Sequence, residues 1–167
     1  MLKKIGIGVA VLLLVIQFIR PERNLGEAVT PQDITHAVAV PDEVMGILKT
    51  ACYDCHSNYT KYPWYANVNP VGLWLQYHID EGKGEMNFSE FATYDLKRQD
   101  HKLEELAEEV AEHEMPLSSY TLIHSEANLT DAQIKTLVDW ANATRASMSG
   151  GSGEAAGEHE EESNEGH

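Results

Sequence analysis

Apolar residues recur at intervals of three and four positions in several stretches of the chain, with polar or charged residues between them. This spacing places the apolar side chains on one face of a helix and predicts amphipathic helices that pack around a core. The last stretch opens with Thr130 and Gln133 at the spacing of a capping box, which marks a helix start. The pattern therefore predicts an all-α fold. The expected helical stretches are residues 41–51, 70–80, 87–91, 100–114 and 130–141.

Prolines and glycines set the other expected helix boundaries. Pro41 and Pro70 stand at helix starts, where a missing backbone N–H is tolerated. Gly82 and Gly84 are expected to end the helix that begins at Pro70. Pro116 forbids continuation of the helix before it and so predicts a loop there.

The first forty residues precede the expected domain. Residues 5–19 are almost wholly apolar, with Gln17 the one polar interruption. As a helix this run would be about 22 Å long, shorter than the roughly 30 Å hydrocarbon core of a bilayer. Bulky residues follow it where a cleavage site would need small ones, so we predict an uncleaved membrane anchor over residues 1–20. Residues 21–40 contain two prolines and little periodicity, which favours an extended tether.

Charge and composition limit the extent of the folded domain and the class of partner. The chain is 43% hydrophobic and 23% charged, which is ordinary for a globular protein, but its formal net charge is −15. Residues 147–167 contain six glutamates and no lysine or arginine, set among small residues, and are predicted to be a disordered acidic tail. One folded domain is therefore expected over residues 41–146. The negative charge excludes nucleic acid as a partner and fits a basic surface on a redox protein.

Cys52, Cys55 and His56 form a single C-x-x-C-H sequence at the end of the first domain helix. Two thiols at this spacing reach both vinyl-derived carbons of one porphyrin, while the next side chain reaches its iron. The chain has only two cysteines, so a structural zinc site would lack its second ligand pair. A thioredoxin-like pair would lie between a strand and a helix, whereas this neighbourhood is helical. The motif predicts one covalent haem c with its iron bound by His56.

A second iron ligand is expected from the far part of the domain. Met115 precedes a proline in the loop after the fourth domain helix, and a thioether opposite His56 would complete a low-spin, six-coordinate iron. His124 is the alternative sixth ligand. His78, Met86, Met45 or an open position are further possibilities.

The order of these features resembles single-haem cytochromes c, and more closely the bacterial haem-binding domain family of short-anchor proteins. The resemblance implies a cytochrome c-like helical domain around one covalently attached haem. The apolar faces of residues 41–51 and 130–141 separately predict that these first and last helices pack across each other and hold the haem. The resemblance also implies thioethers at Cys52 and Cys55, with His56 as the proximal and Met115 as the distal ligand. It covers about residues 41–143 and is carried by Cys52 to His56, Asn69-Pro70, Asn87-Phe88-Ser89, Met115-Pro116 and residues 129–141.

Together these features predict a membrane-anchored monohaem cytochrome c that transfers single electrons and is not an enzyme. Covalent haem is attached outside the cytoplasmic membrane in bacteria, so the haem domain is expected in the periplasm on a single-pass inner-membrane anchor. Membrane respiratory or redox proteins are the expected partners. An open position at the iron would instead favour a haem peroxidase-like enzyme or a haem-based gas or redox sensor.

Overall fold

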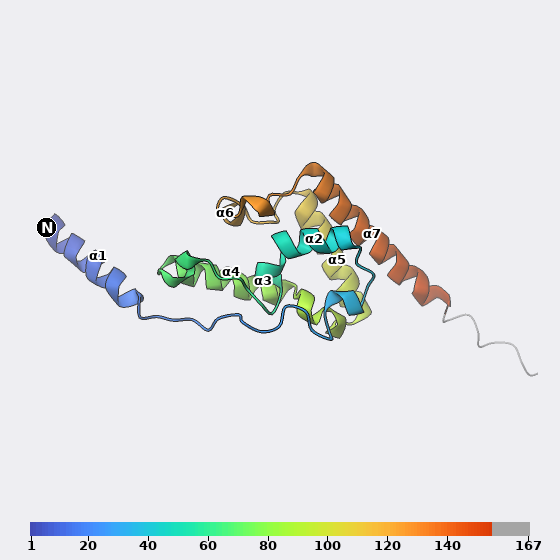
Figure 1. Cartoon of the computed structure of the whole chain (residues 1–167), viewed down its shortest axis with the longest axis horizontal. Coiled ribbons are helices and arrows are strands. Elements are labelled where there is room, and N and C mark those ends of the chain that lie inside the picture. The colour runs from blue at the N-terminus through green and yellow to red at the C-terminus, as the bar shows by residue number, and fades with distance from the viewer. Residues whose placement is uncertain (155–167) are drawn as a thin grey trace, which may run out of the picture. The chain divides into compact units, whose positions relative to one another are not determined.

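The computed structural model of the chain describes residues 1–154, and all regular structure in that range is helical (Figure 1). Within those residues the β pairing is confined to an isolated bridge between Leu25 and Tyr59. The all-α prediction is confirmed. The chain divides into two compact units, of which the first covers Met1–Thr93 and the second starts at Tyr94. The domain predicted over residues 41–146 is thus divided between two units.

The first unit contains four α-helices and three 3₁₀ helices. They are α1 (Leu2–Ile16), η1 (Ile34–His36), α2 (Asp42–Ala51), α3 (Tyr53–His56), η2 (Trp64–Asn67), α4 (Val71–Glu85) and η3 (Phe88–Thr93). The second unit contains α5 (Leu96–Ala111), α6 (Ser118–Thr121), η4 (Ser125–Ala127) and α7 (Asp131–Glu154).

Local capping explains where several helices begin. Pro41 is the N-cap of α2, and the first turn of that helix carries two acidic side chains, which the helix dipole favours. At α7 the capping box is present as predicted, because the Thr130 backbone N–H donates to Gln133 Oε1 at 2.9 Å and the Gln133 N–H donates to Thr130 Oγ1 at 3.3 Å.

Helix α4 is longer than predicted, because it passes through Gly82 and Gly84 and ends at Glu85. A glycine inside a helix costs only about 1 kcal/mol relative to alanine, so packing can override it. At Gly82 the packing is close, since a Cβ there would lie 3.1 Å from the carbonyl oxygen of Cys55. The expectation that these glycines end the helix was wrong, and the absence of a side chain at Gly82 instead lets α4 approach α3.

The segment predicted as an extended tether is part of the packed first unit. Asp33 and Ile34 are fully buried, and Asn24 is buried as well. The Asp33 carboxylate accepts hydrogen bonds from Tyr53 Oη at 3.0 Å and from the Thr35 backbone N–H at 3.1 Å. Because η1 also packs against η3, residues 24–36 contribute to the core of this unit.

In the second unit, α5 and α7 pack along each other and bury their apolar faces. The Arg145 guanidinium on α7 joins the two helices through Asp100 at 3.1 Å and Glu104 at 2.7 Å. This pair forms a core of its own, which explains why the predicted domain divides before α5. The buried apolar residues of the pair are Leu103, Ala107, Val110, Leu137, Trp140 and Ala141.

Helix α7 continues to Glu154, so residues 147–154 of the predicted acidic tail are helical in the structure. Adding residues to a helix that already exists requires no new nucleation, which makes such an extension inexpensive. The rest of the predicted tail, residues 155–167, lies outside the described residues.

Helix α1 has no buried residue among its 15 positions. Nowhere in residues 1–154 does a helix reach both the length and the apolar character that crossing a membrane demands.

Candidate functional site

Cys52, Cys55 and His56 lie on a single helical turn. Helix α2 ends at Ala51, and Cys52 is both its C-cap and the N-cap of α3. The backbone N–H groups of Cys55 and His56 donate to the Cys52 carbonyl at 3.1 and 2.9 Å, which closes the turn. Both cysteines are free thiols and are half-buried. The local hydrogen bonding therefore brings together the three side chains that the motif predicts to act together.

The environment of the two thiols favours their protonated form. Burial, and then the charge of the neighbouring Cys55, raise the pKa of Cys52 to about 12. Burial, and then the charge of Asp54, raise the pKa of Cys55 to about 11. A thiol–disulfide exchange pair depends on a cysteine with a lowered pKa. The structure thus disfavours the thioredoxin-like alternative for this motif.

The His56 ring is oriented by a backbone carbonyl. Its Nδ1 lies 3.0 Å from the carbonyl oxygen of Met86, and because a carbonyl can only accept, Nδ1 carries the proton. Burial lowers the pKa of His56, against smaller opposing effects of the Met86 and Gly82 backbone, so the ring is neutral. In a neutral imidazole with a proton on Nδ1, the lone pair is on Nε2. His56 therefore presents Nε2 as a metal ligand, in the arrangement usual for metal-binding histidines.

Aromatic packing supports this turn. The Phe88 ring stacks on Tyr53 with a centroid distance of 5.1 Å and contacts the His56 ring edge-on at 6.1 Å. Tyr53 in turn donates its hydroxyl to the buried Asp33. The orientation of His56 thus depends on Tyr53 of α3, on Phe88 of η3 and on Asp33, the N-cap of η1.

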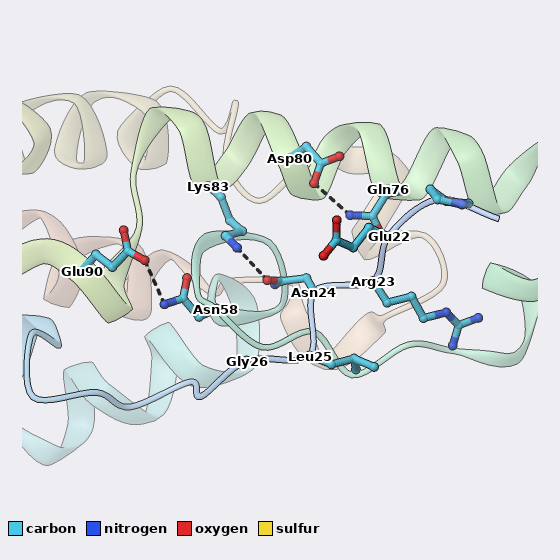
Figure 2. A pocket seen from close by; sticks show the side chains of 11 residues that line it. Glu22, Arg23, Asn24, Leu25, Gly26, Asn58, Gln76, Asp80, Lys83 and Glu90 are labelled. Carbon is cyan, nitrogen blue, oxygen red and sulfur yellow. Dashed lines mark hydrogen bonds between the residues drawn. The ribbon is translucent and has the colours of Figure 1, made fainter.

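A polar network also supports the turn. Asn24 Nδ2 donates to the Ser57 carbonyl at 2.8 Å and to Thr60 Oγ1 at 2.9 Å. The Thr60 hydroxyl donates to the Asp54 carbonyl inside the turn at 2.6 Å. Lys83 Nζ on α4 donates to Asn24 Oδ1 at 2.7 Å, as Figure 2 shows. Nothing in the spacing of Asn24 or Lys83 along the sequence indicated this role, because the contacts join segments far apart in the chain.

Beside this network, a groove of about 490 Å³ lies between the segment before Gly26 and α4 (Figure 2). Its lining includes the basic Arg23 and Lys83 together with three acidic residues. Neither cysteine of the motif nor His56 lines it. The groove is therefore distinct from the C-x-x-C-H turn, and its mixed charge favours no single class of ligand.

Met115 and His124, the two predicted sixth ligands, belong to the second unit. Met115 lies in the loop after α5, half-buried, and its backbone N–H donates to the Glu109 carbonyl at 3.1 Å. The His124 ring stacks on Tyr120 at 4.3 Å, and its Nδ1 lies 3.5 Å from Glu126. The structure describes each unit separately, so the pairing of either ligand with His56 stays a prediction.

Met86 and His78, two of the weaker candidates for the sixth position, lie in the first unit. The Met86 carbonyl meets Nδ1 of His56, which places the Met86 backbone on the side of the imidazole away from Nε2. A residue that would bind the iron together with His56 would have to lie beyond Nε2, so this position argues against Met86. His78 lies on α4, where its ring contacts Trp74 edge-on at 4.5 Å and its Nδ1 is 4.0 Å from Glu81.

These residues fit a covalently attached haem. Two protonated thiols and a neutral imidazole with its lone pair on Nε2 lie on one turn, and the turn is supported by contacts from α4, η3 and the segment around Asn24. Comparison with curated proteins and with solved structures finds no match. The haem-binding domain family, in contrast, matches residues 11–143, which is most of the sequence. The chain belongs to the haem-binding domain family.

Proposed function

We propose that this protein is a c-type cytochrome that carries single electrons, with one haem attached through Cys52 and Cys55. The observation that carries the proposal is the hydrogen bond from His56 Nδ1 to the Met86 carbonyl, because it places the proton on Nδ1 and so leaves the lone pair on Nε2, in the same helical turn as two thiols. Each thiol adds across a vinyl double bond, the sulfur to one carbon and the proton to the other, so attachment needs no oxidant. The bound haem supplies a one-electron Fe(III)/Fe(II) couple.

The chain's own residues have three roles in this proposal. Cys52 and Cys55 hold the porphyrin covalently, and His56 binds the iron through Nε2. Met115 would provide the second side-chain ligand to the iron, with His124 as the alternative. Methionine sulfur favours Fe(II), so the His56/Met115 pair would raise the reduction potential.

We further propose that α1 anchors the protein in the cytoplasmic membrane as a single-pass segment, so that the haem domain faces the periplasm. The apolar run continues past α1 to residue 19, and no residue of α1 is buried. The net charge of −15 favours a partner with a basic docking surface, such as a membrane reductase or another redox protein.

The attachment is tested by producing the full chain in bacteria that mature c-type cytochromes. We expect haem to remain on the polypeptide after denaturation in wild type, to depend on both cysteines, and to be lost in a Cys52→Ser, Cys55→Ser double variant. Haem that dissociates on denaturation of the wild type would contradict covalent attachment. Recovery of the protein in the membrane fraction, with protease access only from the periplasm, tests the location.

The axial ligand is tested by visible spectroscopy of the holoprotein with and without carbon monoxide. We expect no carbon monoxide response in wild type, and loss of a methionine–iron charge-transfer band in Met115→Ala but not in Met45→Ala. Loss of low-spin character in His124→Ala instead would assign His124. A wild type that binds carbon monoxide readily would replace the electron-carrier proposal with a peroxidase-like enzyme or a sensor.

A further inference from the structure

The C-terminal end of α1 is fastened to the turn that begins α4. Gln17 Nε2 donates to the Asn69 carbonyl at 2.8 Å, and the Asn69 backbone N–H donates to Gln17 Oε1 at 3.0 Å. The buried Asn69 side chain donates to the carbonyls of Ile16 at 2.7 Å and Ile19 at 2.8 Å. Four hydrogen bonds, which join Asn69 to three residues about fifty positions earlier in the sequence, therefore fix where α1 leaves the first unit.

Two cations lie at the same place. Arg20 Nη1 donates to the Asn67 carbonyl at 3.3 Å, and Arg23 Nη2 donates to Asn67 Oδ1 at 2.5 Å. The Arg23 guanidinium also lies over the Tyr62 ring, 4.7 Å from its centroid. Both side chains remain exposed, so this end of the unit carries positive charge in a protein that is otherwise strongly acidic.

Large apolar side chains are exposed on the two elements that flank this turn. Trp64 on η2 is 78% exposed and Trp74 on α4 is 47% exposed. Val68 and Val71 between them are exposed to a similar degree as Trp74. We call Trp64, Val68, Val71 and Trp74 the aromatic rim. The elements that carry it touch directly, since a Cβ on Gly72 would lie only 2.3 Å from the Ala66 carbonyl oxygen.

Helix α4 changes character along its length. Its first half carries Val71 and Trp74 and no charged residue, whereas the charged residues gather in its second half. Gly82, beside Cys55 and His56, lies in that second half, about 16 Å along the helix axis from Val71. The apolar end of α4 is thus the end that holds α1, and the C-x-x-C-H turn lies toward the charged end. The charged residues are Asp80, Glu81, Lys83 and Glu85.

We propose that the aromatic rim rests in the headgroup layer of the membrane in which α1 is inserted. The proposal rests on the proposed membrane attachment. Tryptophan is enriched at this depth, where its ring is buried and its N–H stays hydrated, and Arg20 and Arg23 match anionic lipid phosphates. The apolar run of residues 5–19 is shorter than the hydrocarbon core, which draws the attached unit against the surface.

This arrangement has a consequence for electron transfer. With the fastened end of α4 on the bilayer, the C-x-x-C-H turn is held at a set distance above the membrane and in one orientation. A partner would then meet the haem site from the aqueous side. The fastening by Asn69, rather than the length of a flexible tether, would determine that orientation.

Tryptophan quenching in lipid vesicles tests the rim. The haem-loaded full chain is reconstituted into phosphatidylcholine–phosphatidylglycerol vesicles with ordinary or acyl-brominated lipids, and emission is compared as a ratio so that constant quenching by haem cancels. The chain has three tryptophans, and Trp140 is buried in the second unit. We expect wild type to lose emission in brominated vesicles and the Trp64→Phe, Trp74→Phe double variant, which keeps Trp140, to lose none.

Flotation of the same vesicles distinguishes failure of the aromatic-rim proposal from failure of the proposed membrane attachment. If the protein floats with the vesicles while Trp64 and Trp74 are not quenched, the membrane does not cover the aromatic rim, although membrane attachment still holds. A protein partner or haem would then cover the rim. Protein that fails to float would overturn attachment and the rim with it. Replacing only the exposed tryptophans by phenylalanine leaves the buried core intact, and an unchanged haem spectrum verifies folding of the double variant.

Discussion

Asn24 Nδ2 lies 2.8 Å from the carbonyl oxygen of Ser57, the residue directly after His56 in the sequence. The segment between the N-terminal helix and the first domain helix therefore supports the C-x-x-C-H turn from outside. Asn24 is buried, and its Oδ1 is held by Lys83 from α4. The turn is consequently fixed by two elements that the motif does not include.

Asn24→Ala tests this support. We expect the free energy of unfolding to fall by about 1–3 kcal/mol, because the Ser57 carbonyl and the Lys83 ammonium lose a buried partner. The measurement is urea unfolding followed by circular dichroism, together with the yield of haem-loaded protein. Glu22→Ala, two positions earlier and exposed, serves as the control and should change stability by less than about 0.5 kcal/mol. Equal stability of the two variants would show that the network does not support the turn.

Tyr53→Phe tests the buried pair of Tyr53 and Asp33. Removing the hydroxyl leaves the fully buried Asp33 side chain with one donor fewer, and we expect a loss of about 1.5–3 kcal/mol. Tyr77→Phe removes an exposed hydroxyl bound to Glu81 and should cost less than about 0.5 kcal/mol. If both variants are equally stable, the buried hydrogen bond contributes nothing net.

The loss of stability caused by Tyr53→Phe is expected to depend on pH. Burial, and then the charge and hydrogen bond of Asp33, raise the pKa of Tyr53 above its unfolded value of about 10. The folded state therefore holds the phenolic proton more tightly than the unfolded state does. The resulting stabilisation is complete below about pH 10 and is lost as the pH rises further. We expect the stability difference between wild type and Tyr53→Phe to narrow above that pH, and a difference independent of pH would contradict the assigned cause.

Gly72→Ala tests the contact between η2 and the first turn of α4. The added Cβ would lie 2.3 Å from the Ala66 carbonyl oxygen, so backbone must move, and we expect a loss of about 1–3 kcal/mol despite the better helix propensity of alanine. Gly84→Ala on the same helix meets nothing within 4 Å and should stabilise by up to about 1 kcal/mol. Opposite signs in thermal unfolding are the expected result. A stabilised Gly72→Ala protein would mean that the two elements do not approach this closely.

Thr130→Ala tests the capping box of α7. Its hydroxyl satisfies the Gln133 backbone N–H, and its removal should cost about 0.5–2 kcal/mol. Thr50→Ala is the matched control, because the Thr50 hydroxyl donates to the Gly46 carbonyl within α2 and caps no helix end. That second substitution should be neutral or slightly stabilising. The comparison uses chemical unfolding of the full chain, and a smaller effect at Thr130 than at Thr50 would contradict the capping role.

Most helices of this protein and its C-x-x-C-H turn can be predicted from patterns of neighbouring residues. Apolar spacing predicted the α2, α4, α5 and α7 helices, Pro41 and the Thr130–Gln133 pair predicted two starts, and C-x-x-C-H predicted the turn with both thiols and His56. Each of these depends on hydrogen bonds or side chains within about four residues of one another, which a linear pattern records. The family membership agrees with that interpretation.

The other features of the site depend on contacts between residues far apart in the sequence. The Met86 carbonyl that orients His56, the Asn24 support, and burial of Asp33 under Tyr53 join residues twenty or more positions apart, and no local pattern encodes which backbone group will meet which side chain. Gly82 was read as a helix end because glycine is a poor helix former, whereas its lack of a side chain serves the approach of α4 to Cys55. Differences in helix propensity amount to about 1 kcal/mol per residue, which is less than the free energy that packing a core side chain contributes.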